Sequence, residues 1–410
     1  MPVGARGSWY NGLRRKRLVW AAVAVAVLMI GTVTYLYASS VWVHRGVSTV
    51  ETEAWSPKLA VDGFGRVHVL FRTEYGFHYY WVGSGHGYSM SAPTARSSNL
   101  IIGDLERACF AYVLKNVDDA YSVGVYIKDG LIDIETVFIA NDVDDVSPSV
   151  ALDSSGHLHV SYSAGGTLCY ATDSSGEWEV TTVLAEPSGS DPYDWARWIT
   201  VILIDSGDRP HIIYGIHTAQ MGHVQRLDNG TWVDETIAEW EGGVPYVAAA
   251  IGSDDLIHAC YVMTDRTAGG SELVHADNAG GSWVGTTVLH SDLLKGMGSF
   301  SLALRRSGEP AISFSEPGSY DVDYICMTDG RWTDAERIAK STLASECTLC
   351  FDSEDSPYVA YASDDGIEYA TKSATLSERL WAAALGICLM ILVVVVPVVL
   401  VRFVRRNPKP

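Results

Sequence analysis

The sequence predicts an all-β protein, a seven-bladed β-propeller flanked by two transmembrane helices. Three observations predict it. An aromatic residue recurs every 41 to 53 residues, short alternating runs with turn dipeptides fill each interval, and an uncharged apolar run lies near each end. The recurring aromatic residues are Phe71, Tyr112, Tyr162, Tyr214, Tyr261, Phe314 and Tyr361. Each interval accommodates four short strands, and no helical periodicity appears between the terminal runs, so a solenoid of stacked helices is excluded.

Other residues repeat at fixed distances from these aromatic residues. Three positions earlier stand His68, His159, His211 and His258; nine positions earlier stand Asp62, Asp153, Asp205 and Asp352; and after them come Trp178, Trp232, Trp283 and Trp332. We expect the aspartates to accept hydrogen bonds from turn amides. Equivalent positions of successive blades lie too far apart for one metal ion, so each histidine is expected to make a structural hydrogen bond. We therefore expect no metal site and no cofactor.

The seventh unit lacks its last strand in sequence order. The third strand, 366–371, leads directly toward the second apolar run, and no Trp-led run follows it. Directly after the first apolar run, Trp42 and Val47 have the same spacing as Trp178 and Val183. We therefore expect the N-terminal segment to supply the outer strand of the last blade, which closes the ring and removes its open edges.

The terminal runs are long enough to cross a bilayer as helices. The chain is expected to comprise a basic tail at 1–17, a membrane helix at 18–38, the propeller at 41–372, a membrane helix at 380–401 and a basic tail at 402–410. Basic residues at both outer ends place both termini in the cytoplasm, and the propeller then lies outside the cell membrane. The first run is either an uncleaved anchor or a cleaved signal peptide.

The charge is distributed unevenly along the chain. All 49 acidic residues lie within 39–379, where only 20 Lys and Arg accompany them. This acidic middle excludes nucleic acid as a partner, because phosphate binding needs a basic face. Membrane lipid is the expected partner of the two apolar runs, and a carbohydrate or an envelope protein is a candidate partner of the propeller.

Units such as 147–184 resemble the sialidase-like propeller repeats, also called Asp-box or BNR-type repeats. The Asp-box reads Ser/Thr-x-Asp-x-Gly-x-Thr-Trp, and its best counterpart, 278–283, keeps a glycine, a hydroxyl residue and Trp283. The resemblance implies the propeller architecture and an exported protein. In that family the box marks a turn between outer strands and is not catalytic, so the resemblance implies no activity.

Six of the seven cysteines fall on expected strands and one, Cys388, falls in the second apolar run. We expect the six to be buried thiols that pack as small apolar residues. The acidic cluster 142–145 does not have the spacing of an EF-hand calcium loop, so it gives little support to a calcium site.

The blade-to-blade crossings carry the candidate ligand-binding residues. With the membrane runs joined to one strand turn of the last blade, the crossings lie on the face that points away from the membrane. Aromatic residues and carboxylates on exposed loops are suited to stacking on sugars or capturing cations. The candidate residues are Asp145, Tyr193, Asp194, Trp195, Arg197, Trp240 and Glu241. Alternatively, some of these aromatic residues cover the core.

These observations favour a membrane-anchored, extracytoplasmic recognition module without catalytic residues. Two alternatives remain. One is a sialidase-like carbohydrate-active hydrolase, for which the expected outward arginines are Arg72, Arg96, Arg197 and Arg266, scattered over several blades. The other is a scaffold for the assembly of envelope proteins. Fold alone does not decide among them.

Overall fold

The computed structural model describes residues 42–48, 54–82, 86–91, 96–97, 99–103, 107–115, 120–129, 133–143, 148–185, 199–216, 220–239, 246–264, 270–291, 299–315, 319–340 and 346–372. The chain divides into two units, 44–370 and the terminal segments 1–43 and 371–410. Both predicted membrane runs lie outside the described residues. In the part that is described, no helix is long and apolar enough to span a membrane.

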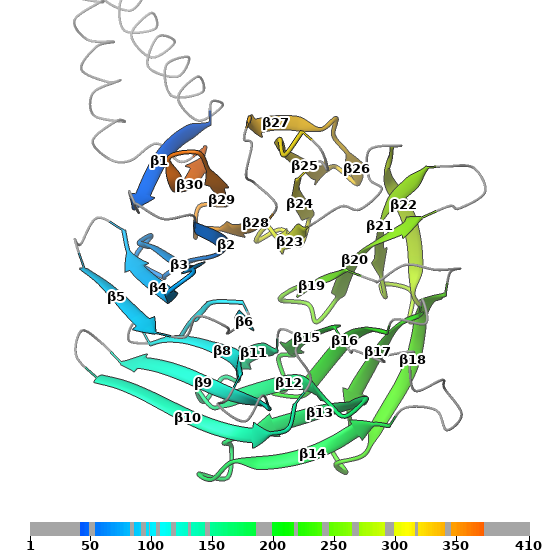
Figure 1. Cartoon of the computed structure of the whole chain (residues 1–410). Coiled ribbons are helices and arrows are strands. Elements are labelled where there is room, and N and C mark those ends of the chain that lie inside the picture. The colour runs from blue at the N-terminus through cyan, green and yellow to red at the C-terminus, as the bar shows by residue number, and fades with distance from the viewer. Residues whose placement is uncertain are drawn as a thin grey trace, which may run out of the picture. The chain divides into compact units, whose positions relative to one another are not determined.

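Seven antiparallel sheets are arranged around a common centre, which confirms the all-β class and the seven blades (Figure 1). Blade 1 consists of β2 (Ala54–Val61), β3 (Val67–Thr73), β4 (Gly76–Trp81) and β5 (His86–Ser91). Blade 2 consists of β6 (Arg96–Ser97), β7 (Ile101–Ile102), β8 (Ala108–Lys115), β9 (Tyr121–Asp129) and β10 (Asp133–Asn141). Blade 3 consists of β11 (Ser149–Leu152), β12 (Leu158–Ala164), β13 (Thr167–Thr172) and β14 (Glu179–Leu184). Blade 4 consists of β15 (Ile199–Ile204), β16 (Pro210–Ile216), β17 (Gln220–Arg226) and β18 (Trp232–Glu239).

The remaining blades follow the same antiparallel pattern. Blade 5 consists of β19 (Val247–Ile251), β20 (Ile257–Thr264), β21 (Ser271–Asp277) and β22 (Val284–Ser291). Blade 6 consists of β23 (Phe300–Leu304), β24 (Pro310–Ser315), β25 (Val322–Thr328), β26 (Arg331–Trp332) and β27 (Glu336–Ala339). Blade 7 consists of β28 (Cys347–Phe351), β29 (Pro357–Ser363), β30 (Gly366–Thr371) and, from the other end of the chain, β1 (Val43–Ser48).

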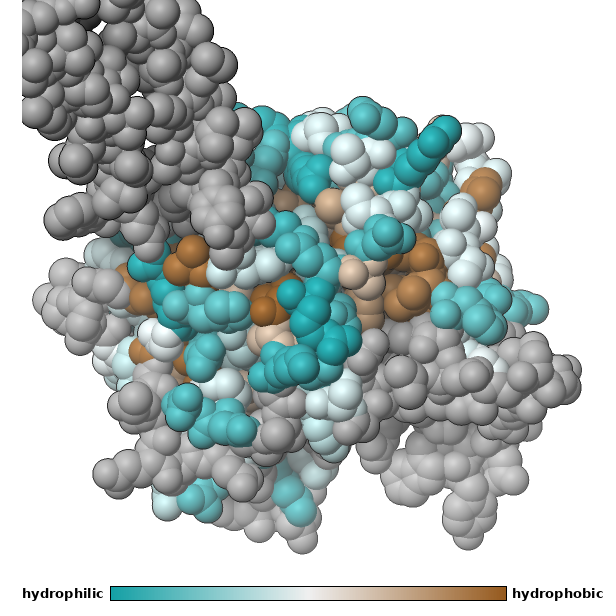
Figure 2. Space-filling view, turned by 90° about the horizontal axis from the view of Figure 1, so that it is seen from above, coloured by the Kyte–Doolittle hydropathy of each residue, from teal (hydrophilic) through white to brown (hydrophobic). Residues whose placement is uncertain are grey.

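Burial changes from the inner to the outer strand of each blade. First strands of neighbouring blades contact one another around the axis, as β19 does with β23 and β23 with β28. Second strands are buried along almost their whole length, because apolar side chains on both faces pack against adjacent blades. Fourth strands such as β14 and β18 are mostly exposed. Hydrophilic and near-neutral side chains accordingly cover most of the coloured surface in Figure 2.

The closure of the ring by the N-terminal strand is confirmed. The strand order in blade 7 is β1-β30-β29-β28, so the two ends of the propeller sequence meet in one sheet. Val47 of β1 packs against the hydrophobic cluster that blades 7 and 1 share, which includes Leu59 and Phe71. In the terminal unit, the Lys372 ammonium lies 5.0 Å from the centroid of the Trp42 ring.

The repeated aromatic residues hold the blades together. All seven anchor aromatics at the second-strand positions are at most 4% exposed. Tryptophans of the outer strands contact the preceding blade edge-on: Trp232 lies 5.2 Å from Tyr170, Trp283 lies 5.6 Å from His223, and Trp332 lies 5.4 Å from His275 between ring centroids. Each of these contacts joins two blades through one T-shaped pair.

The cysteine expectation is confirmed for the described residues. Cys109, Cys169, Cys260, Cys326 and Cys347 are buried and Cys350 is half-buried, and all six are free thiols. Cys347 Sγ lies 3.4 Å from Ser313 Oγ of blade 6, whereas Cys350 packs against the cluster of blades 7 and 1. The two side chains therefore face opposite sides of their strand and do not form a Cys-x-x-Cys site.

Candidate functional site

The seven residues that the sequence analysis proposed for ligand binding all lie in the blade-to-blade crossings. Asp145, Tyr193, Asp194, Trp195, Arg197, Trp240 and Glu241 fall outside the described residues. The structure therefore neither brings them together nor separates them. It describes instead the opposite ends of the strands, where the turns between first and second strands surround the axis of the propeller.

An aspartate at the first position organises four of these turns. In blade 3, Asp153 Oδ1 accepts hydrogen bonds from the backbone N–H groups of Ser155, at 2.9 Å, and His157, at 2.8 Å. The same pair of bonds recurs at Asp62, Asp205 and Asp352. The expected role of the repeated aspartates is thus confirmed, and hydrogen bonds from turn and side-chain groups lower the pKa of Asp62 although burial opposes them.

The repeated histidines bridge the turn and the third strand. His68 Nε2 donates to Asp62 Oδ2 at 3.1 Å, and its Nδ1 is joined to the Tyr79 hydroxyl at 2.6 Å. His159 makes the same two contacts, with Asp153 and Tyr170. Because the carboxylate only accepts, Nε2 carries the proton and Nδ1 accepts from the tyrosine. The structural hydrogen bond expected for these residues is confirmed.

Blade 4 replaces the tyrosine with a second histidine, which makes the blade sensitive to acid. His211 Nδ1 lies 2.9 Å from His223 Nε2, and burial, followed by the neighbouring His211, lowers the pKa of His223 to about 3. The nearest carboxylate oxygen, Oε2 of Glu235, lies 3.7 Å from His223 Nδ1 and belongs to an exposed side chain. His223 is therefore neutral in the folded protein at neutral pH, while the unfolded chain titrates near pH 6.5.

We expect the contribution of neutral His223 to the free energy of unfolding to be fully present above about pH 6.5. It should be lost as the pH falls toward 3. The unfolded chain binds one more proton in this window, so this group lowers the free energy of unfolding by about 1.4 kcal/mol per pH unit. His223→Tyr, which reproduces the partner found in blades 1 and 3, should flatten the dependence. Urea denaturation between pH 7 and 4.5 checks this, and equal slopes for the two proteins would contradict it.

At three junctions, a carboxylate at the fourth position of the turn joins neighbouring blades, a feature that the sequence analysis missed. The backbone there has positive φ, as at Gly156, Asp208, Asp255 and Gly308. Asp208 accepts hydrogen bonds from Ser154 of blade 3, from the backbone N–H at 2.8 Å and from Oγ at 2.7 Å. Asp255 accepts the same two bonds from Ser206, and Asp355 accepts the backbone N–H of Arg306 at 2.7 Å. We call each of these inter-blade contacts a clasp.

Removal of a clasp carboxylate should destabilise the propeller. Asp208→Ala loses both bonds from Ser154 and keeps a side chain at φ 61°, so we expect a loss of about 2 kcal/mol in unfolding free energy. Asp208→Gly loses the same bonds but relieves the backbone strain, so its loss should be about 1 kcal/mol. Thermal unfolding checks this order, with exposed Asp334→Ala as a neutral control. A glycine variant less stable than the alanine variant would contradict it.

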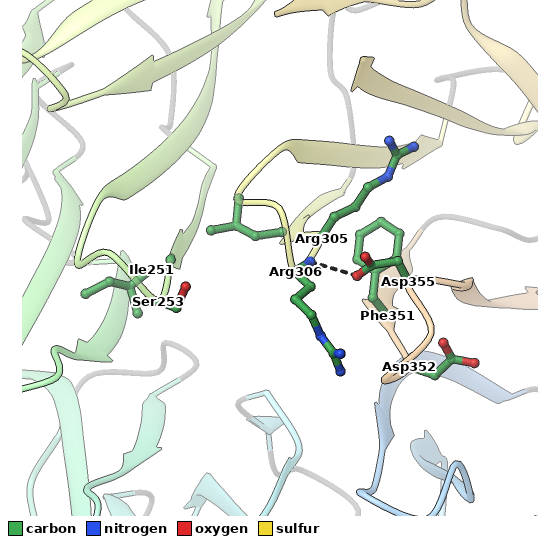
Figure 3. Close-up of a pocket in the computed structure, with 9 residues that line it drawn as sticks. Ile251, Ser253, Arg305, Arg306, Phe351, Asp352 and Asp355 are labelled. Atoms are coloured by element: carbon green, nitrogen blue, oxygen red, sulfur yellow. Dashed lines mark hydrogen bonds between the residues drawn. The ribbon is translucent and has the colours of Figure 1, made fainter. Parts of the chain in front are cut away.

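A clasp is missing between blades 5 and 6, as it is where Gly65 and Gly156 occupy the fourth position, and at this junction a pocket opens. Blade 6 has Gly308 at the fourth position, so Ser253 of blade 5 has no carboxylate to bind there. The pocket at this junction has a volume of about 290 Å³. It is lined by Ser253, by Arg306 of blade 6, and by Phe351 and Asp352 of blade 7 (Figure 3). The open clasp therefore coincides with a hollow bordered by three blades.

Two charged groups in this pocket can still form hydrogen bonds with a ligand. Within the described residues, no group is hydrogen-bonded or ion-paired to the Arg306 guanidinium, which extends into the open space in Figure 3. Asp352 uses Oδ1 for its turn, but blade 7 has Ser356 and Tyr358 where blades 1, 3 and 4 have Arg or His. Its Oδ2 thus lacks the partner that Asp62, Asp153 and Asp205 have. Arg305, by contrast, is paired with Glu309 at 3.5 Å.

A second pocket, of about 330 Å³, lies between blades 6 and 7. The Tyr361 hydroxyl in it donates to Glu368 Oε2 at 2.8 Å and lies 2.7 Å from His44 Nδ1. Burial and the adjacent Glu368 raise the pKa of Tyr361, so its phenol is protonated at neutral pH. Of the four expected outward arginines, only Arg72 has a described side chain, and it lies over the Trp55 ring at 5.6 Å.

No protein-family model matches the sequence, and no curated protein matches it either. Among solved structures, the chain is similar to an ulvan lyase of polysaccharide lyase family PL25, with TM-score 0.55, 10% identity, and 82% of this chain and 99% of that one covered. It is also similar to an inactive virginiamycin B lyase from Staphylococcus aureus, with TM-score 0.54, 12% identity, and 81% and 100% covered. The BP39L lectin from Burkholderia pseudomallei gives TM-score 0.50, 13% identity, and 80% and 94% covered. At identities this low, the structural similarity shows a shared propeller fold and nothing further.

Proposed function

We propose that this protein is a membrane-anchored, extracytoplasmic recognition module that binds a neutral carbohydrate in the pocket between blades 5, 6 and 7. The observation that carries the proposal is the pair of unused charges there, the Arg306 guanidinium and Asp352 Oδ2. A carboxylate oxygen accepts hydrogen bonds from sugar hydroxyls, and a guanidinium donates to their oxygens. The half-buried Phe351 adds an apolar surface for a sugar ring.

The charge of the protein supports a neutral ligand. The chain has a formal net charge of −20, and two carboxylates, Asp352 and Asp355, line the same pocket as Arg306. A polyanionic polysaccharide would meet an unfavourable potential on approach. Lectins and polysaccharide lyases are among the proteins with this fold, which supports carbohydrate as the ligand class without indicating which sugar.

The membrane attachment rests on the sequence. The uncharged runs 18–38 and 380–401 have the length and the basic outer flanks of membrane helices whose outer ends are cytoplasmic. The propeller would then lie on the outer side of the cell membrane, with lipid as the partner of both helices. The crossings would point away from the membrane, and the pocket at the first-to-second turns would lie on the membrane side of the propeller. Protease protection of the tails in sealed vesicles, with digestion of the propeller from outside, would support this topology; the reverse pattern would overturn it.

The ligand is best sought by thermal unfolding of the full-length chain with a panel of neutral methyl glycosides. A ligand that binds only the folded state stabilises it by about 2.7 kcal/mol at a hundredfold excess over its Kd. Arg306→Gln and Asp352→Asn should abolish the shift, while Arg331→Gln and Asp334→Asn, exposed residues of the same blade 6, should keep it. A shift that survives both pocket variants would place the site elsewhere, for instance on the crossings.

A sialidase-like hydrolase is the second candidate, and the Tyr361–Glu368 pair in the other pocket is the observation that favours it. Sialidases, whose propeller repeats this sequence resembles, use a Tyr nucleophile with carboxylates nearby. Hydrolysis of a sialoside that is lost in Tyr361→Phe but retained in Arg306→Gln would support it. Scaffolding of envelope proteins is the remaining alternative, and it predicts no response to any sugar.

A further inference from the structure

Blade 5 departs from the histidine arrangement of blades 1 and 3 in two ways. The first turn position is Gly252, so His258 lacks the aspartate that holds His68, His159 and His211. The third strand, β21, has His275 where blades 1 and 3 have tyrosine, and it ends in Asp277. Blade 4 shares the second histidine but has Gln225 at the position of Asp277.

The strand register brings three potential metal ligands together. His258 pairs directly with Asp277 across β20 and β21, and Cys260 pairs with His275, so His258, His275 and Asp277 face the same side of the sheet. His258 Nδ1 lies 2.9 Å from His275 Nε2. One ligand atom from each of the three residues lies within 4.8 Å of the others.

We propose that His258, His275 and Asp277 form a binding site for a divalent transition metal ion of the Zn²⁺ class. Two imidazole nitrogens and one carboxylate oxygen are a ligand set that Zn²⁺ accepts, with a fourth position for water. Nitrogen atoms 2.9 Å apart subtend roughly a right angle at an ion about 2.0 Å from each, so the rings would have to turn away from their mutual hydrogen bond and separate slightly to reach tetrahedral ligation.

The surroundings of the three residues fit an ion. His258 and His275 are 5% and 3% exposed, and burial lowers the pKa of both, so both are neutral at pH 7 and each has a lone pair to offer. Asp277 is half-buried, which leaves an approach from solvent. Asp254 raises the local negative potential, because it lies near enough to interact with His258 electrostatically. The ion would replace the hydrogen bond between the two rings.

Blades 1, 3 and 4 supply the variants for a test. His275→Tyr copies Tyr79 and Tyr170, so it keeps a hydrogen-bond partner for His258 but removes a ligand. Asp277→Asn keeps the acceptor that binds the Ala279 N–H at 3.1 Å and removes the charge. His223→Tyr makes the same exchange in blade 4, where Gln225 takes the place of Asp277. Gln225→Asp should complete the ligand set there.

The experiment is calorimetric titration of the metal-free full-length chain with Zn²⁺ and with Co²⁺, whose visible spectrum reports nitrogen ligation and coordination number. We expect one bound ion in the native protein and in His223→Tyr, and none in His275→Tyr. Asp277→Asn should bind the ion at least about tenfold more weakly. Gln225→Asp should bind two ions. No binding to the native protein would overturn the proposal, as would an ion that His275→Tyr still holds, for example on a thiol. If His275→Tyr does not fold, unaltered affinity in Asp277→Asn would overturn it equally.

Discussion

Deletion of β1 should lower the free energy of unfolding by on the order of 5 kcal/mol, because the variant loses several ladder hydrogen bonds and the burial of Val47. Six residues, Val43–Ser48, provide the fourth strand of blade 7 from the opposite end of the sequence. Without them, β30 becomes an open edge and the contact between the two ends of the propeller is lost. Amide hydrogen exchange should then rise first in β29 and β30.

The control for this deletion lies in the same strand. Gly46 has open space around the position of an added Cβ, so Gly46→Ala should leave both unfolding and exchange unchanged. The closure is contradicted if the deletion variant unfolds at the native midpoint, or if exchange rises evenly over all blades instead of in blade 7.

Gly222→Val is expected to destabilise the propeller by about 3 kcal/mol or more, because its Cβ would overlap the side chain of Tyr214. Gly222 pairs directly with Tyr214, and a Cβ on it would come within 2.3 Å of Tyr214 Cζ. The tyrosine cannot retreat easily, since it is 2% exposed and its hydroxyl donates to Asp234 at 2.8 Å. Urea denaturation gives the difference.

Two further variants separate this steric effect from a general sensitivity to lost glycine. Gly280→Ala, in a turn with no atom within 4 Å of the new Cβ, should be close to neutral. Tyr214→Leu makes room beneath β17, so the double variant with Gly222→Val should be more stable than the sum of the two single losses implies. Strict additivity would contradict the proposed clash.

The repeat could be predicted because it is a property of spacing. Each anchor aromatic, such as Tyr162, sits on a buried second strand, and period and strand number together determine a propeller. The closure could be predicted for the same reason, since Trp42 and Val47 keep the offset of a fourth strand. The roles of Asp153 and His159 followed from the tendency of short polar side chains to satisfy turn amides.

The pocket could not be predicted in this way, because it depends on what one blade lacks relative to its neighbours. Gly308 is unremarkable alone and matters only because Asp208 and Asp255 carry clasps at the same position. A Ser at the second turn position with an Asp at the fourth position of the next turn was the available signal. The available Oδ2 of Asp352 likewise stands out only in comparison with Asp62 and Asp205, whose Oδ2 atoms accept hydrogen bonds from arginines.

The His258–His275 contact was missed for a related reason. The repeat relates histidines at equivalent positions of different blades, and these lie far apart. The contact is between two strands of one blade, and it depends on the register that places Cys260 opposite His275. A one-residue shift in pairing would turn His275 to the other face, so the sequence spacing alone does not establish the pair.

The most direct test of the recognition pocket is to close it with the clasp that it lacks. Gly308→Asp introduces the carboxylate found at Asp208, at a backbone φ of 85° and with no atom within 4 Å of the new Cβ. Gly65→Asp is the matched control, because it would accept from Ser353 at the junction of blades 7 and 1, outside the pocket lining.

The measurement is calorimetric titration of both variants and the native protein with the neutral methyl glycosides, accompanied by thermal unfolding. We predict that both variants unfold at or above the native midpoint, that Gly65→Asp binds the sugar as the native protein does, and that Gly308→Asp does not bind it. Undiminished sugar binding by a stably folded Gly308→Asp would contradict the account.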